Sequence, residues 1–188
     1  ASQSGNGRSY NEVFSADHLE GTNPQGDGGF GRGQRGSSSE YGQSAGEQYT
    51  LPAASLDPLS AEEAAALTYM REEEKLAHDV YVTLYAQWGL STFTNISQSE
   101  QVHTEAIKAL LDRYSLSDPA TDEVGVFTNA DLQALYNDLV ARGGESLAEA
   151  IKVGAAIEEI DIIDLQKRLE QTDNADIHQV YNNLMNGS

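Results

Sequence analysis

Residues 59–89 read LSAEEAAALTYMREEEKLAHDVYVTLYAQWG, and this stretch decides the fold class. Ser60 followed by Glu63 is the pattern of a capping box, and Gly89 is a typical helix end, so the stretch predicts one long helix. Its inward face alternates three- and four-residue steps, as in an amphipathic helix. That face consists of Leu67, Met70, Glu74, Ala77, Tyr81, Leu84 and Trp88. Glu74 is its single charged member, so the sequence predicts a carboxylate inside the helical core.

A second helix is predicted in SQSEQVHTEAIKALLDRY, residues 97–114, with its cap near Ser97 or Ser99. Its inward series has the same alternating spacing and consists of Ile96, Glu100, His103, Ile107, Leu110 and Tyr114. Glu100 and His103 are its polar members. A helix that turns two ionisable side chains toward apolar neighbours needs a compensating interaction there.

The rest of the sequence also predicts helices. A shorter one starts at Thr128 or Asn129 and ends at the glycine pair 143–144, and a third long helix begins at Ser146. The inward series of that long helix is Leu147, Ile151, Gly154, Glu158, Asp161 and Leu165. The last segment, NADIHQVYNNLMNGS, has an apolar face of Ile177, Tyr181 and Leu184. Because no strand pattern interrupts these helices, we predict an all-α antiparallel bundle, with the shorter helix in the crossover between long helices two and three.

The inward polar residues predict a specific chemistry. A buried carboxylate is costly unless a proton, a basic partner or a metal ion compensates its charge. Glu100 and His103 have the Glu-x-x-His spacing of di-metal bundles, in which single glutamates from other helices complete the site. Glu74 is one such glutamate, and in the third long helix the stripe position favours Glu158 over Glu159. The metal interpretation predicts iron or manganese, two ions if the site is complete. In the alternative, protons and hydrogen bonds neutralise the same groups.

Residues 1–50 differ in composition from residues 51–188. They are rich in Gly and Ser and too poor in apolar side chains to build a core, so we expect an extended arm followed by a helical domain. Aromatic residues are spaced along the arm, and they would anchor it on a neighbouring subunit. These residues are Tyr10, Phe14, Phe30 and Tyr41. The arm therefore predicts a homo-oligomer or homopolymer.

Charge and composition exclude several classes of protein. The formal net charge is −19, which argues against nucleic acid as a partner. The sequence has no cysteine, which excludes disulfides, thiolate metal sites and cysteine nucleophiles. No stretch is long and apolar enough to span a bilayer. The first residue is Ala1 rather than Met, as in a processed exported protein, so we expect a secreted or cell-surface location.

Five segments, in the order REEEKLAHDVY, SEQVHTEAI, DLQALYNDLVARG, VGAAIEEIDIIDLQ and DIHQVYNNLMNGS, resemble the DUF2202 family. The resemblance covers about residues 57–188 and implies a ferritin-like four-helix bundle of uncharacterised function. EKLAHDVY is also similar to the surroundings of the metal-bearing glutamate in rubrerythrin-type proteins, which implies Glu74 rather than Glu72 or Glu73. The family pattern continues past NGS into an Asn-His stretch, where a histidine seven residues beyond Leu184 would face inward. Without that histidine, the last helix has no predicted ligand.

Two functions are consistent with these patterns. The first is an exported ferritin-like protein with a di-iron or di-manganese carboxylate site, oxidoreductase-like in character, whose substrate and catalytic residues the pattern does not specify. The second is a structural subunit of an extracellular filament or lattice, assembled through residues 1–50, in which the metal site is vestigial or structural.

Overall fold

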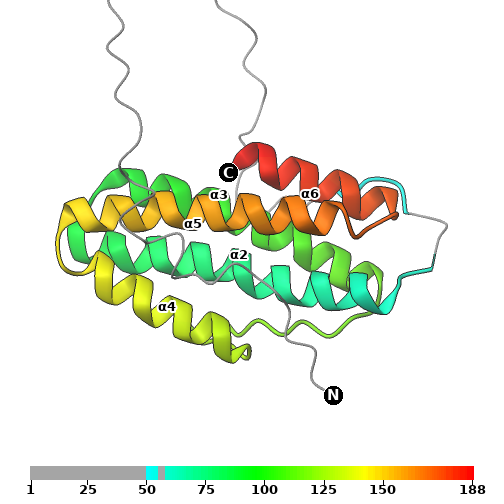
Figure 1. The fold of residues 1–188 in the computed structure, drawn as a ribbon, viewed down its shortest axis with the longest axis horizontal. Helices are drawn as coiled ribbons and strands as arrows, with labels where there is room; N and C mark the ends of the chain where they lie inside the picture. The colour runs from blue at the N-terminus through cyan, green and yellow to red at the C-terminus, as the bar shows by residue number, and fades with distance from the viewer. Residues whose placement is uncertain (1–49, 55–57) are drawn as a thin grey trace, which may run out of the picture. The chain divides into compact units, whose positions relative to one another are not determined.

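The computed structural model describes residues 50–54 and 58–188. Its helices are α2 (Ala61–Trp88), α3 (Ser91–Arg113), α4 (Ala130–Gly143), α5 (Leu147–Leu169) and α6 (Ala175–Gly187) (Figure 1). These ranges contain no strand, so the all-α prediction is confirmed. Each helix in them is too short or too polar to cross a membrane. The arm predicted for residues 1–50 lies, apart from Thr50, outside the described residues, and so do the subunit contacts predicted from it.

The ends of α2 lie where the sequence predicts them. The Ser60 hydroxyl accepts a hydrogen bond from the Glu63 backbone N–H at 3.1 Å, and the Glu63 carboxylate accepts one from the Ser60 N–H at 2.9 Å. Gly89 ends the helix at φ 64°, in the left-handed region that glycine adopts without strain. Glu63 also accepts from the Thr172 hydroxyl at 2.6 Å and the Asn174 amide at 2.9 Å. The first turn of α2 is thereby joined to the turn before α6.

The predicted start of α3 is wrong. The helix begins at Ser91, well before the expected cap at Ser97 or Ser99, and Leu90 at its N-cap makes no side-chain cap hydrogen bond within the described part of the chain. An apolar contact takes the place of a cap, because Phe93 is buried with its ring centroid 6.0 Å from that of Tyr81. Ser97 lies inside the helix and its hydroxyl donates to the Thr94 carbonyl at 2.9 Å.

The long helices enclose one apolar core. α2 packs most extensively on α3, α6 lies along α5 and α3, and α4 packs on α2 and α5 on the opposite side (Figure 1). Asp176 in the first turn of α6 accepts hydrogen bonds from Arg113 and Tyr114, both at 2.8 Å, which attaches that turn to the end of α3. The side chains that pack together in this core include Leu67, Met70, Ile107, Leu110, Leu165, Ile177, Tyr181 and Leu184.

The inward series predicted for the start of α5 is partly wrong. Leu147 and Ile151 were expected to face inward, yet they are 39% and 53% exposed. Ala150 and Val153 are buried in these turns instead, while Gly154 is buried as predicted. The reason is close packing on α2 at Gly154, where a side chain would meet the Tyr81 ring at 3.3 Å, so the contact face runs through Ala150, Val153 and Gly154.

The opposite side of α2 holds the connection between α3 and α4. Glu72 accepts hydrogen bonds from the Thr128 hydroxyl at 2.9 Å and the Asn129 N–H at 3.0 Å, at the start of α4. Arg71 donates to Asp118 at 3.0 Å and to the Thr104 carbonyl at 3.2 Å. Consecutive residues of α2 therefore bind different parts of this connection, which places α4 against α2.

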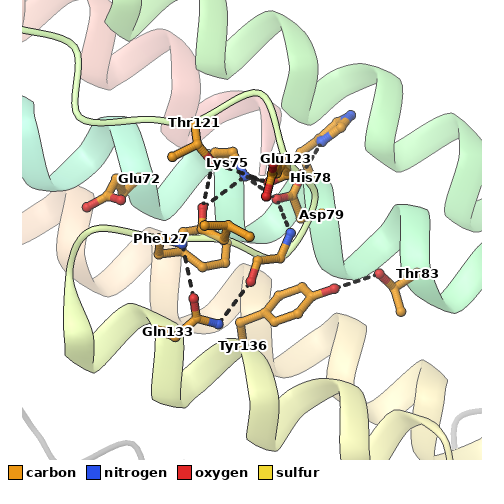
Figure 2. Close-up of polar contacts among 12 residues, drawn as sticks. Glu72, Lys75, His78, Asp79, Thr83, Thr121, Glu123, Phe127, Gln133 and Tyr136 are labelled. Atoms are coloured by element: carbon orange, nitrogen blue, oxygen red, sulfur yellow. Dashed lines mark hydrogen bonds and ion pairs between the residues drawn. The ribbon is translucent and has the colours of Figure 1, made fainter.

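Lys75 and Asp79 extend this anchorage by one turn. Figure 2 shows the Lys75 ammonium between Asp79 and the carbonyl of Glu123, to which it donates at 2.8 Å. Asp79 accepts from the Gly125 N–H and from His78, both at 2.9 Å. With Arg71 and Glu72, these residues hold the connection between α3 and α4 against α2.

Candidate metal centre

Glu74 lies in the middle of α2, on a face that meets α3. Its side chain is buried, with 1% of its surface exposed. No residue in the described ranges makes a hydrogen bond of normal geometry to either of its carboxylate oxygens. Buried carboxylates are almost always hydrogen-bonded or paired, so this group requires an additional partner.

Glu100 and His103 approach Glu74 from α3. The His103 Nδ1 atom lies 3.3 Å from Glu100 Oε2 and 3.4 Å from Glu74 Oε2. One ligand atom from each of the three residues lies within 4.8 Å of the other two, which is close enough to share one metal ion. All three side chains are buried. Glu100 and His103, predicted on one face of the second helix, thus meet Glu74, the glutamate predicted on the inward face of the first.

Burial and charge control protonation in this group. Burial raises the pKa of Glu74 well above its usual range, and the nearby Asp161 carboxylate raises it further. Burial alone would lower the pKa of His103, but its contacts with Glu100 and Glu74 outweigh that effect and raise the pKa to about 11. Without an ion, His103 is therefore an imidazolium held between two carboxyl groups.

Glu158, the predicted ligand of α5, lies beside this group rather than within it. It is half-buried, and its Oε1 atom accepts a hydrogen bond from the Tyr81 hydroxyl at 2.7 Å. Burial raises the pKa of Glu158 to about 7; the Tyr81 hydrogen bond lowers it, while the charges of Glu100 and Asp161 raise it. Glu158 is therefore close enough to Glu100 to affect its charge balance, although it is not one of the three clustered groups.

Asp161 is a buried acid whose role the sequence did not predict. Its Oδ2 atom accepts a hydrogen bond from the Ser188 hydroxyl at 2.6 Å, whereas its Oδ1 atom has no partner among the residues described. Burial raises the pKa of Asp161 to about 6, against the effect of the Ser188 hydrogen bond. The sequence did indicate that Asp161 faces inward, because it belongs to the predicted inward series. It follows Glu158 by three residues, just as His103 follows Glu100 by three.

The last turn of α6 closes over these side chains. A side chain at Gly187 would come within 2.6 Å of His103 Nε2, so the helix backbone lies directly against that ring. Ser188 follows and reaches Asp161. One turn of α6 therefore restricts both His103 and Asp161.

A small pocket adjoins the cluster between α2, α4 and α5. Two acids, Glu73 and Asp161, line it together with the aliphatic side chains of Leu76, Ala77, Leu135, Leu139, Ile157 and Ile160. Neither oxygen of Glu73 has a hydrogen-bond partner within the described ranges. Burial raises the pKa of Glu73 well above its usual range, and the carboxylates of Asp164 and Asp161 raise it further. The sequence analysis set Glu73 aside in favour of Glu74 and did not predict its burial, because it falls outside the α2 stripe.

Two other histidines and Glu72 do not belong to this cluster. His78 is half-buried and pairs with Asp79 rather than Glu74, and Glu72 binds the start of α4. His178 is exposed on α6, with its Nδ1 atom 2.8 Å from the Asn182 amide. The group of Glu74, Glu100 and His103 therefore remains as a set of two carboxylates and one imidazole. Such a set, with unpartnered oxygens facing inward, fits a divalent transition metal.

Comparison with known proteins places the chain in a family. It is similar to the uncharacterized protein MJ0754 of Methanocaldococcus jannaschii, with 53% identity over 132 residues, which cover 70% of this chain and 71% of that protein. It is also similar to the crystal structure of the hypothetical protein MJ0754 from Methanococcus jannaschii, with a TM-score of 0.70 and 51% identity, covering 74% of this chain and 78% of that one. The family model described as "Uncharacterized protein domain (DUF2202)" matches residues 63–188. The chain therefore belongs to the DUF2202 family.

Proposed function

We infer that this protein holds iron or manganese in its helical core, through Glu74, Glu100 and His103. The observation that supports this most strongly is Glu74, which is fully buried with two carboxylate oxygens that no described residue satisfies by a regular hydrogen bond. An ion at the group would supply that missing partner. A ligand set of carboxylate oxygens and one imidazole suits iron or manganese. A thiolate zinc site would need cysteine, which the sequence lacks.

The charge balance of the surroundings supports the same proposal. The carboxyl groups of Glu158 and Asp161 lie near the three ligands, and among the described residues His103 is the basic side chain that contacts Glu74 and Glu100. Without an ion, protons neutralise part of this charge, since the pKa values of Glu74, Glu158 and Asp161 are raised, and divalent ions could take the place of those protons. A second ion beside the first, held by Glu158 together with Glu100, would bring the cluster close to neutrality. This arrangement corresponds to the di-iron or di-manganese type.

A bound ion of this kind supplies Lewis-acid or redox chemistry. The chain's own groups would control the surroundings: Tyr81 holds the Glu158 carboxylate in place, and the last turn of α6 excludes water from His103.

The proposal extends to the fold class. The pairings α2 with α3, α5 with α6, and α3 with α6 support a ferritin-like bundle of these four helices, with α4 in the crossover between α3 and α5. Export and assembly through residues 1–50 stay predictions, because residues 1–49 lie outside the described part of the chain.

Elemental analysis of the full chain, purified without chelator, tests the metal proposal. We expect near-stoichiometric iron or manganese in the wild type and its loss in the double variant Glu100→Gln, His103→Asn. The matched control is Glu105→Gln, His178→Asn, which removes the same two residue types from exposed positions of α3 and α6.

The control should keep the metal of the wild type. If neither the wild type nor the control holds a transition metal after incubation with Fe²⁺ or Mn²⁺, the proposal is wrong. The cluster would then be a core of carboxyl groups neutralised by protons and hydrogen bonds.

A further inference from the structure

The His103 ring lies between the carboxylates of the metal group and the end of α6. On one side, its Nδ1 atom is 3.3 Å from Glu100 Oε2 and 3.4 Å from Glu74 Oε2. On the other side, the first atom of a side chain at Gly187 would come within 2.6 Å of Nε2 and 3.1 Å of Cε1. The edge of the ring that carries Nε2 therefore lies against the backbone of α6, and Nδ1 is the nitrogen that faces the carboxylates.

Position 187 requires glycine for space rather than for backbone conformation. Gly187 belongs to the last turn of α6, and the glycines of the described ranges that have a positive φ are Gly89 and Gly125 instead. Inside a helix alanine is more stable than glycine, so the reason for glycine here is packing. Non-bonded carbon atoms pack at about 3.5 to 4.0 Å, and a methyl group at this position would therefore displace the ring, which is the movable end of its side chain.

The last turn of α6 is held in place on both sides of Gly187. Before it, Leu184 is buried in the core with 2% of its surface exposed. After it, the Ser188 N–H donates to the Leu184 carbonyl at 3.0 Å, and the Ser188 hydroxyl donates to Asp161 of α5 at 2.6 Å. The backbone at Gly187 therefore has a defined position, against which the His103 ring rests.

The orientation of this ring determines how well it can bind an ion. An imidazole binds a metal through the lone pair of one nitrogen, which lies in the plane of the ring, so a rotated ring no longer points that lone pair at the ion. Metal-binding histidines are usually oriented by a contact at their other nitrogen. For His103 the contact on that side is the backbone of Gly187.

We propose that Gly187 is a positioning residue of the metal site. Because it has no side chain, the last turn of α6 packs on the Nε2 edge of His103 and keeps Nδ1 directed at the ion, while Ser188 fastens that turn to α5. The inference rests on the proposed function. It adds a role for α6, a helix that supplies none of the three clustered ligands.

The first test is titration of the chelated full chain with Mn²⁺, in the wild type and in Gly187→Ala. We expect the affinity of the variant to fall about tenfold or more, the usual effect of losing a contact that orients a ligand. In the Co²⁺-loaded variant, the visible absorption should change in position and intensity, because it reports the geometry of the ligands.

The matched control is Gly143→Ala, which creates the same crowding away from the ligands. A side chain at Gly143 would come within 2.6 Å of the Leu84 side chain, where α4 meets α2. This control should melt at a lower temperature than the wild type, and it should keep the Mn²⁺ affinity and the Co²⁺ spectrum of the wild type. Equal losses of Mn²⁺ affinity in the two variants would show that Gly187 acts through stability alone.

The second test is a double-mutant cycle in the metal-free protein. With His103 present, Gly187→Ala should lower the melting temperature, because the methyl group crowds the ring. In a His103→Asn background the far edge of the ring is absent, so the same change should raise the melting temperature, because alanine is the better helix former. The same decrease in both backgrounds would contradict a contact between Gly187 and His103.

The outcomes separate this inference from the function on which it rests. If the wild type binds Mn²⁺ and Gly187→Ala binds it equally well with the same Co²⁺ spectrum, Gly187 does not position His103 and the metal site stands without it. If the wild type binds no transition metal, the proposed function fails and the positioning role fails with it.

Discussion

Tyr81 is the side chain through which α2 reaches α5 beside the cluster. Its hydroxyl donates to Glu158 at 2.7 Å and lies 3.1 Å from the Gly154 carbonyl. Burial raises the pKa of Tyr81 above its usual range, and the Glu158 carboxylate raises it further, so the phenol stays a donor at any physiological pH. The position of Glu158 therefore depends on this one hydroxyl.

Replacing Tyr81 by Phe removes the hydroxyl that donates a hydrogen bond to Glu158. We expect the free energy of unfolding to fall by about 1 kcal/mol, the usual net value of a hydrogen bond whose partner is partly accessible to water. Mn²⁺ affinity should also fall, because Glu158 is no longer held at the edge of the site. Urea unfolding and Mn²⁺ titration measure the two effects.

Tyr136→Phe provides the control, since the Tyr136 hydroxyl bonds to Thr83 at 2.8 Å on the α4 side of α2. It should cost similar stability and leave Mn²⁺ binding unchanged. Equal losses of Mn²⁺ affinity in both variants would show that Tyr81 acts through general stability alone.

At this scale, the sequence predicted the cluster better than its surroundings. Glu74, Glu100 and His103 could be identified because each interrupts an apolar stripe, and the structure brings them together. The place of Asp161 in the inward series was also predicted, but not its contact with Ser188, because that contact joins residues 27 apart in sequence across two helices. No local pattern carries such information.

Among the helices, α2 is the one whose own charged side chains, as well as its apolar ones, are buried on nearly every side. Glu72 provides the clearest case, because it accepts hydrogen bonds from Thr128 and Asn129 at the start of α4. An acceptor at this position satisfies free N–H groups of the helix terminus and interacts favourably with its dipole. α2 thus contributes to the capping of α4 from outside that helix.

Glu72→Ala should separate α4 from α2. We expect a loss of about 3 kcal/mol in the free energy of unfolding, since a buried charged acceptor with several donors is removed. Hydrogen exchange should accelerate over residues 115–143 more than in α3. Glu105→Ala, an exposed change on α3, is the control and should alter neither measurement. Uniform acceleration across all helices would contradict a local role for Glu72.

The start of a helix could be predicted from the sequence where a polar side chain caps it. Ser60, Asn129 and Ser146 each cap a helix as expected, because a side-chain oxygen accepts from free backbone N–H groups. The start of α3 was not predictable, because burial of Phe93 rather than a capping residue begins it. Similarly, the exposure of Ile151 depends on how closely α2 approaches α5, which periodicity alone does not determine.

For the whole molecule, the buried acids predict an unusual dependence of stability on pH. In the chelated protein, the pKa of Glu158 is about 7 and that of Asp161 about 6, both above their ordinary values of 4.5 and 3.8. The folded state therefore binds more protons than the unfolded state, and stability falls as pH rises through this window. His103, with a pKa of about 11 instead of 6.5, acts in the same direction above pH 6.5.

The opposite trend begins only in acid. Glu63, with its pKa lowered to about 2 by hydrogen bonds that outweigh burial, contributes stability that is lost as pH falls below 4.5. We therefore expect the chelated protein to be most stable at about pH 4. Thermal unfolding in EDTA between pH 3 and pH 8 measures this.

Saturating Mn²⁺ should reverse the trend above that optimum. Its ligands must lose their protons to bind, so metal stabilisation grows as pH rises. At a free Mn²⁺ concentration of about one hundred times the dissociation constant, the gain is about 2.7 kcal/mol. Superimposable melting curves with and without Mn²⁺ at pH 7.5 would contradict a metal site in the folded state.

Consecutive residues in the middle of α2 make contacts on different sides of the helix, which determines how an insertion or deletion there would act. Arg71 and Glu72 bind the connection to α4, Glu74 faces the cluster, and Lys75 binds the carbonyls of that connection. One residue inserted or deleted among them would rotate everything beyond it by about 100° around the helix axis. The charged side chains past that point would then no longer face their own hydrogen-bond and ion-pair partners. We therefore expect one inserted or deleted residue in the middle of α2 to destabilise the protein more than a single substitution there, and more than a change of length in the segments outside it.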